Sequence, residues 1–194
     1  MGAPRFIFFD IRPKVIAALK AVDLGSKKGI IVTGHSKGAA ASFLAASLLK
    51  GQYFKNLLVE VCCFAAPLVA DPTFRDNYHA LGLGPLSVRY QNEYDVVPFL
   101  PYWPFLDVLA AGERLHRDGM NVVITEAERQ KAMENDYVPI GILRFITKEC
   151  DIEYGQKAES DAGRDFEDAF FSGRFLEIVD AHEAQGRYLT CVCS

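Results

Sequence analysis

The chain has 194 residues, of which 50% are hydrophobic, and its 21 basic and 25 acidic side chains give a formal net charge of −4. This length and apolar content suit one globular domain over residues 1–194. The basic residues are scattered rather than gathered in a stripe, which argues against nucleic acid as a partner. The sequence as written shows no signal peptide or membrane span. We therefore expect a cytoplasmic protein, or a secreted one if the N-terminus is truncated.

The cysteines are five in number, and two of them, Cys62 and Cys63, are adjacent. An odd count without metal-ligand spacing favours buried free thiols over a disulfide framework or a zinc site. This pattern indicates a reducing compartment.

The first half of the chain predicts alternating strands and helices. Arg5–Phe9 is expected to be a short strand, and Pro13–Leu24 has the apolar spacing of a helix with a proline in its first turn. A buried strand is predicted at Lys28–Thr33, and the alanine-rich segment Gly38–Leu49 suits a helix that packs closely on a sheet. Leu57–Ala65 is the next predicted strand. This order is typical of βαβ units and predicts an α/β fold with a mainly parallel sheet.

The second half continues the pattern less regularly. Extended segments are predicted at Leu86–Tyr90, Val122–Ile124 and Ile140–Thr147, and a mixed helical pattern covers Asp165–Asp180. The polar segment Glu149–Arg164 is predicted to be a surface connection or a mobile hairpin.

The most informative motif is Gly34-His35-Ser36-Lys37-Gly38, which lies between a β-branched run and an alanine-rich helix. A serine on a sharp strand-to-helix turn needs small neighbours, and the turn presents its hydroxyl beside the N-terminus of the helix. Ser36 is therefore the candidate nucleophile.

A serine hydrolase also needs a base and an acid, which follow the nucleophile in the order acid and then histidine in this type of sheet. Asp95 lies just past a predicted strand and just before a proline-rich turn, and is the candidate acid. Glu93 is the alternative acid. Aspartate also caps turns, so the residue type leaves both roles open for Asp95.

Of the four histidines, two do not fit this order. His35 lies inside the elbow, where we expect it to point away from the serine, and His79 precedes the acid. The base is therefore His116 or His182, and the order favours His182, although a lone late histidine is often an exposed surface residue.

These motifs together resemble the class 3 lipases, the fungal-type triacylglycerol lipases of the α/β-hydrolase fold. The similarity covers the elbow Val32–Gly38, the strand end Cys63–Pro67 and the acid loop Asn92–Pro101. The resemblance implies an α/β-hydrolase-like three-layer sandwich that is shortened at its N-terminus. It also implies Ser36, Asp95 and His182 as a catalytic triad, with Tyr188 accompanying the histidine, and places His116 outside catalysis.

The chain departs from the family pattern at several positions. Ala39 and Ala65 stand where glycines are usual, and Lys37 replaces a leucine. The Lys37 side chain is either a solvated lysine or a cation at the mouth of the site that favours anionic head groups. The backbone N–H of Lys37 is the expected oxyanion donor. The family's upstream oxyanion strand and lid have no counterpart here, so a second donor must come from Met1–Asp10, from another chain, or from nowhere.

The resemblance implies a carboxylester hydrolase, a lipase or esterase that cleaves esters such as glycerides through an acyl-enzyme, or another acyl hydrolase such as a thioesterase. The alternative is a weak or inactive lipase-fold fragment that binds lipids or protein partners. No metal or organic cofactor is implied. The apolar segment Val97–Gly112 is either core or a lipid-contacting wall or flap. The strand at Ile30–Thr33 is expected near a sheet edge, where it could pair in a homodimer.

Overall fold

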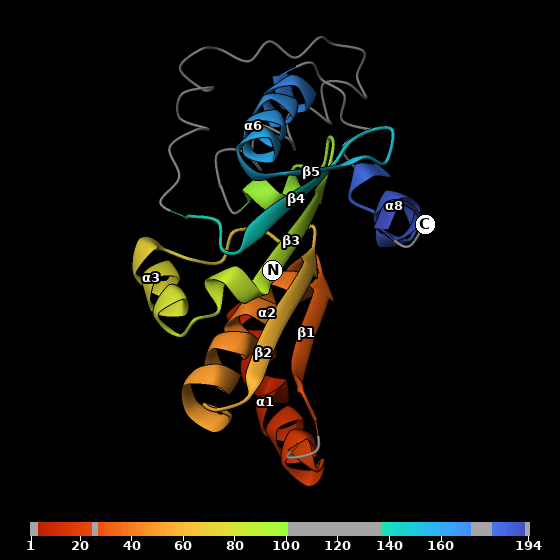
Figure 1. Cartoon of the computed structure of the whole chain (residues 1–194). Helices are drawn as coiled ribbons and strands as arrows, with labels where there is room; N and C mark the ends of the chain where they lie inside the picture. Colours follow the sequence, from red (N-terminus) through yellow and green to blue (C-terminus); the bar gives the residue numbers. More distant parts are fainter. Residues whose placement is uncertain (1–3, 25–26, 101–136, 172–179, 193–194) are drawn as a thin grey trace.

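The computed structural model describes residues 4–24, 27–100, 137–171 and 180–192. Helices and strands alternate over residues 4–92, as Figure 1 shows. The helices and strands are α1 (Pro4–Ala21), β1 (Gly29–His35), α2 (Lys37–Leu48), β2 (Leu58–Phe64), α3 (Pro72–Ala80), β3 (Ser87–Asn92), β4 (Ile142–Ile146), β5 (Ile152–Tyr154), α6 (Gly155–Phe171) and α8 (Leu189–Val192). Within these residues no helix is both long and apolar enough to span a membrane.

Within the described residues, the strands form one five-stranded sheet in the order β1-β2-β3-β4-β5. The first four strands are parallel, and β5 pairs with β4 in the antiparallel direction. The register aligns His35 with Phe64, and Phe64 with Tyr90, at the carboxyl ends of the strands. Loops that follow the parallel strands therefore meet at the carboxyl ends of these strands, which is the usual location of a site in such folds.

Small side chains allow α2 to lie close to the sheet. Ala39 and Ala46 are fully buried on α2, and the Cys63 thiol on β2 donates to the Ala39 carbonyl at 3.5 Å. The same core contains Phe43 of α2 and Tyr78 of α3, whose rings pack edge to face with their centroids 6.0 Å apart. This packing fixes the start of α2 against the end of β1.

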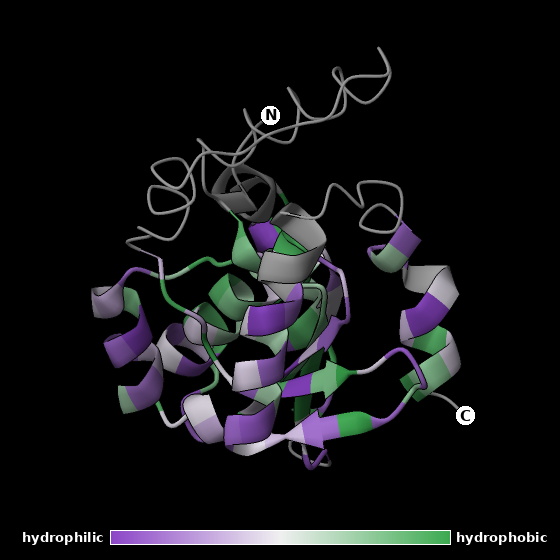
Figure 2. Ribbon diagram, turned by 90° about the horizontal axis from the view of Figure 1, so that it is seen from above, coloured by the Kyte–Doolittle hydropathy of each residue, from purple (hydrophilic) through white to green (hydrophobic). Residues whose placement is uncertain are grey.

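The two faces of the sheet are covered by different helices. Helices α2 and α6 pack on one face, and the C-terminal segment, with Tyr188 and Cys191, packs on the other against Ala65 and Ile146. Figure 1 shows α8 on the side of β3 opposite α2. In Figure 2, seen from above, apolar residues gather in the middle of the molecule and polar residues line the outer turns of the helices.

Two secondary-structure predictions are wrong. Arg5–Phe9 is part of α1 rather than a strand, since a short apolar run does not distinguish a strand from a helix. Glu149–Arg164 is neither an irregular connection nor a hairpin alone, because it contains β5 and most of α6. Lys157 pairs there with Asp161 one helical turn away at 2.7 Å, and such pairs support a helix of polar composition. Val122–Ile124 lies outside the described residues.

The prediction that the cysteines are free is wrong for one pair. Cys150, in the turn between β4 and β5, and Cys191, on α8, form a disulfide with their Cα atoms 4.9 Å apart. Cys62 and Cys63 are free, and Cys63 is buried. The disulfide removes the basis for expecting a reducing compartment.

The strand β1 lies at one end of the sheet formed by the described strands, as expected. The side chain of Ile31 on this strand is 69% exposed. The homodimer that this edge suggested stays a prediction.

Candidate active site

Ser36 occupies a strained turn between β1 and α2. Its backbone has φ 55° and ψ −128°, outside the regions that most residues adopt. The Ser36 N–H extends the ladder with β2 by donating to the Phe64 carbonyl at 3.0 Å. The Ser36 carbonyl accepts the N–H of Ala39 at 2.9 Å and so begins the helix. The structure thus contains the strand-turn-helix elbow that the sequence predicts.

Asp95 lies in the turn that follows β3. Its N–H donates to the Asn92 carbonyl at 3.1 Å, and its Oδ1 accepts the N–H of Val97 at 2.9 Å. The Asp95 side chain has no exposed surface. A buried carboxylate is stable only when hydrogen-bond donors replace the lost water.

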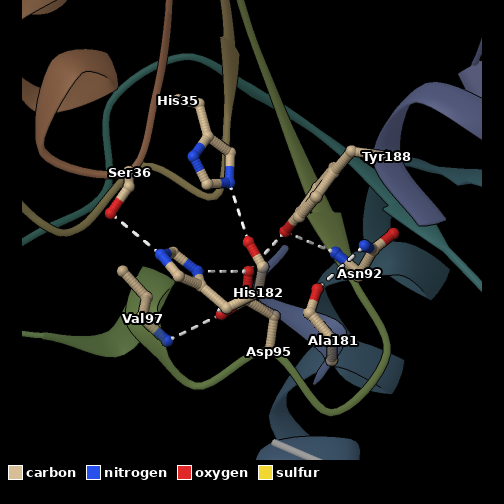
Figure 3. Close-up of polar contacts among 8 residues, drawn as sticks. All are labelled: His35, Ser36, Asn92, Asp95, Val97, Ala181, His182 and Tyr188. Carbon is tan, nitrogen blue, oxygen red and sulfur yellow. Dashed lines mark hydrogen bonds and ion pairs between the residues drawn. The ribbon is translucent and has the colours of Figure 1, made fainter. Parts of the chain in front are cut away.

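His182 joins Asp95 to Ser36, as Figure 3 shows. Its Nδ1 lies 3.1 and 3.2 Å from the two carboxylate oxygens of Asp95, and its Nε2 lies 2.8 Å from Ser36 Oγ. The structure therefore brings together the three residues that the sequence predicts, although His182 is 146 positions from Ser36 in the chain.

Tyr188 completes the shell around the acid. Its hydroxyl donates to Asp95 Oδ2 at 2.5 Å and accepts the Asn92 N–H at 3.0 Å (Figure 3). Burial, and then the neighbouring Asp95 carboxylate, raise the pKa of Tyr188 well above its usual range. The hydroxyl therefore remains a proton donor to the carboxylate. Asn92 also binds the segment before His182, through a 3.0 Å bond from its Nδ2 to the Ala181 carbonyl.

His35 is a site residue that the sequence reasoning missed. The sequence reasoning expected it to point away from the serine and gave it no role; its Nε2 donates to the His182 carbonyl at 2.8 Å, and the centroids of the two rings lie 4.9 Å apart (Figure 3). Burial lowers the pKa of His35, so the ring is neutral at neutral pH and supports the His182 backbone. In the strand register His35 lies beside Phe64, whose ring also contacts Tyr188.

Comparison with known proteins assigns the chain to a family. The family model for lipase (class 3) matches residues 8–105, which include the elbow and the acid turn. The chain is a class 3 lipase family member.

Individual relatives match the chain over shorter lengths. The chain is 40% identical over 81 residues to protein EDS1 of Arabidopsis thaliana, covering 38% of this chain and 12% of that protein. It is 37% identical over 76 residues to a secreted mono- and diacylglycerol lipase of Gibberella zeae, covering 39% of this chain and 24% of that protein. The chain thus spans less than a quarter of the curated relatives that it matches.

Solved structures share the fold of this class 3 lipase chain. The structure of Rhizomucor miehei lipase in a propeptide complex is 20% identical and aligns with a TM-score of 0.54, covering 82% of this chain and 44% of that one. At this low sequence identity, the structural similarity supports the α/β-hydrolase fold and nothing more specific.

Two of the departures from the family pattern now have a structural context. Lys37 is the first residue of α2 and its side chain is exposed, which fits a solvated lysine beside the site. Ala65 is buried with φ 51°, a left-handed conformation that favours glycine. The usual glycine at this position is therefore explained by backbone geometry as well as by close packing.

The other candidate residues lie elsewhere. Asp95, rather than Glu93, contacts His182, and the Glu93 N–H pairs with the Ile146 carbonyl at 2.9 Å. His79 is an exposed residue of α3. His116, and Val97–Gly112 from residue 101 onward, lie outside the described residues.

Proposed function

We propose that the chain is a serine carboxylester hydrolase of the lipase and esterase type, with Ser36 as nucleophile, His182 as base and Asp95 as acid. The observation that carries this proposal is the continuous chain of hydrogen bonds from Ser36 Oγ through both nitrogens of His182 to the buried Asp95 carboxylate. A nucleophile, a base and a group that orients the base are the three parts that acyl transfer by serine requires.

The proposed reaction has two stages. In the first, His182 Nε2 accepts the hydroxyl proton of Ser36 while Oγ bonds to the ester carbonyl carbon. The tetrahedral intermediate then breaks its bond to the alcohol, which leaves with the proton from His182, and an acyl-enzyme remains. In the second stage, water gives a proton to His182 and attacks the acyl carbon. Collapse of this intermediate returns the proton to Ser36 Oγ and releases the carboxylic acid.

Asp95 orients His182 throughout this reaction. It accepts the Nδ1–H of His182, which leaves Nε2 free to face Ser36, and it stabilises the imidazolium that forms in each stage. The tyrosine hydroxyl and the Val97 N–H hold the carboxylate in this orientation.

The proposed oxyanion donor is the backbone N–H of Lys37. As the first residue of α2, Lys37 has an N–H that no carbonyl within the helix accepts, and the positive end of the helix dipole lies at the same place. Removing one donor from an oxyanion hole typically lowers turnover by about 100- to 1,000-fold. A site limited to this donor would therefore be a slow esterase.

Acyl esters of glycerol are the proposed substrates. The family assignment and the mono- and diacylglycerol lipase named among the relatives support this class. The same relative is named as secreted, and the Cys150–Cys191 disulfide suits an oxidising compartment. We therefore propose that this lipase acts outside the reducing cytosol.

The test is hydrolysis of p-nitrophenyl butyrate and p-nitrophenyl palmitate by the purified chain. Ser36→Ala and His182→Ala are each expected to abolish turnover, and Asp95→Asn to lower it strongly. His79→Ala is the matched control, because it removes an exposed histidine of α3.

A fluorophosphonate that adds to an activated serine provides a second measurement. It is expected to label Ser36, as detected by mass spectrometry, and not to label the His182→Ala variant. No turnover and no labelling of Ser36 in the parent chain would contradict the proposal and favour a lipid-binding or partner-binding protein.

A further inference from the structure

The turn that carries Asp95 is held by all four of its backbone N–H groups. The Asn92 N–H donates to the Tyr188 hydroxyl at 3.0 Å, and the Glu93 N–H donates to the Ile146 carbonyl at 2.9 Å. The Asp95 N–H donates to the Asn92 carbonyl at 3.1 Å. The fourth N–H, that of Tyr94, donates to Oδ2 of Asp165 on α6. Asp165 thus connects α6 to the acid turn.

Tyr94 is the residue of this turn that most needs such a contact. Its φ is 66°, in the left-handed region that bulky residues rarely adopt. Residues persist there only where their surroundings fix the backbone. A hydrogen bond from the N–H of Tyr94 fixes the orientation of its peptide group, and the next residue along the chain is Asp95.

Asp165 is itself held in place by the helix that carries it. Ala158, Ala162 and Asp165 follow one another at i, i+4 and i+7 and therefore share one face of α6. Ala158 and Ala162 are 0% and 4% exposed and pack against Leu143 and Phe145 of β4. An acidic residue thus continues the buried stripe of α6 where the helix reaches the acid turn.

A salt bridge adds to this anchoring. The nearly buried guanidinium of Arg89 on β3 donates two hydrogen bonds to the Glu159 carboxylate of α6, at 2.9 and 3.1 Å. Asp161, by contrast, belongs to the outer part of the helix, where it pairs with Lys157 and Arg164. Asp161 and Asp165 therefore have different environments.

We propose that Asp165 is a positioning residue that fixes Tyr94 in its left-handed conformation and thereby sets the Asp95 carboxylate against His182 Nδ1. The link runs from the sheet through α6 to the acid turn and does not involve the substrate. In its catalytic meaning the inference rests on the proposed function, but the geometry that it describes can be measured without turnover.

The first test therefore reads the geometry directly by nuclear magnetic resonance. The Tyr94 amide is expected to be protected from hydrogen exchange in the parent chain, and the imidazole proton shared by His182 and Asp95 is expected to give a low-field signal. Asp165→Ala should remove the protection and broaden the low-field signal. Asp165→Asn keeps a carbonyl acceptor and should retain both, and Asp161→Ala is the matched control on the same helix.

The second test compares kcat with KM for p-nitrophenyl butyrate. Asp165→Ala is expected to lower kcat by about 10- to 100-fold with KM within about two-fold, because the displaced acid no longer orients the base. Asp165→Asn should recover most of kcat. If Asp165→Ala folds poorly, adding Tyr94→Gly should restore folding and the low-field signal, since glycine adopts a left-handed conformation without support.

The outcomes separate this inference from the proposed function. A parent chain without turnover whose amide protection and low-field signal still follow the expected pattern contradicts the hydrolase and supports the positioning role. If the parent chain hydrolyses the ester and Asp165→Ala matches it in kcat, in Tyr94 amide protection and in the low-field signal, the positioning role is overturned. Equal losses of kcat in Asp165→Ala and Asp161→Ala would also overturn it.

Discussion

Gly34 and Gly38, the two glycines of the elbow, are expected to respond in opposite ways to substitution by alanine. A Cβ atom on Gly34 would lie 2.6 Å from the carbonyl carbon and oxygen of Gly38, whereas ordinary contacts begin at 3.4 Å. The start of α2 must therefore move away from β1 by about 0.8 Å, the difference between these two distances. A Cβ atom on Gly38 would meet nothing within 4 Å.

Forcing a side chain into a packed site of this kind typically costs about 1–3 kcal/mol. In a chain of this size each kcal/mol corresponds to a change of about 2–4 °C in Tm. The same displacement acts on the 2.8 Å bond between Ser36 and His182, and misplacement by about 1 Å can lower a rate by about 100-fold. Gly38→Ala replaces a glycine inside a helix and is expected to stabilise the fold by about 0.5–1 kcal/mol.

Urea denaturation, monitored by circular dichroism, measures the free energy of unfolding of both variants. The rate of fluorophosphonate labelling measures the reactivity of Ser36. Gly34→Ala is expected to lower both quantities, and Gly38→Ala to raise stability. A Gly34→Ala variant as stable and as rapidly labelled as the parent would refute the steric reasoning. Equal losses of stability in the two variants would mean that the motif needs its glycines for backbone freedom alone.

Three further predictions concern Tyr188, His35 and the disulfide. Tyr188→Phe leaves the buried Asp95 carboxylate without one donor and is expected to lower the free energy of unfolding by about 1.5–3 kcal/mol, measured by urea denaturation. Burial lowers the pKa of His35, so the unfolded chain binds more protons than the folded chain as the pH drops below the usual histidine pKa of 6.5. The free energy of unfolding should therefore fall over that pH range. The fall in Tm between pH 7.5 and pH 5 should be smaller in His35→Gln than in the parent. The Cys150–Cys191 disulfide joins residues 41 positions apart, and loop-closure entropy predicts that it stabilises the fold by about 4 kcal/mol. A reductant should therefore lower the Tm of the parent and leave the Tm of Cys150→Ser unchanged.

The elbow was predictable because its determinants are local. A β-branched run, a pentapeptide with glycine at both ends and an alanine-rich helix specify a strand, a tight turn and a close-packed helix within a short segment. The order of nucleophile, acid and base then left Asp95 and His182 as the main candidates, and the structure brings both to Ser36.

The rest depends on contacts that no local pattern encodes. The pairing of Cys150 with Cys191 needs the β4–β5 turn and α8 to meet, and spacing alone cannot give the connectivity. The first part of α6, residues 155–164, was missed because its buried face is narrow and includes Ala158 and Ala162, while its polar residues resemble a surface loop. Its ion pairs at i, i+4 spacing were the signal available in the sequence.

The long separation between Ser36 and His182 also determines when the site can form during folding. The elbow needs only neighbouring segments, but the contact with His182 closes a loop of 146 residues, and contacts of such high order form late. Helices and strands can therefore be regained before the nucleophile meets its base. During refolding, the proposed esterase activity should return later than the circular dichroism signal, and the delay reports the docking of the last segment of the chain.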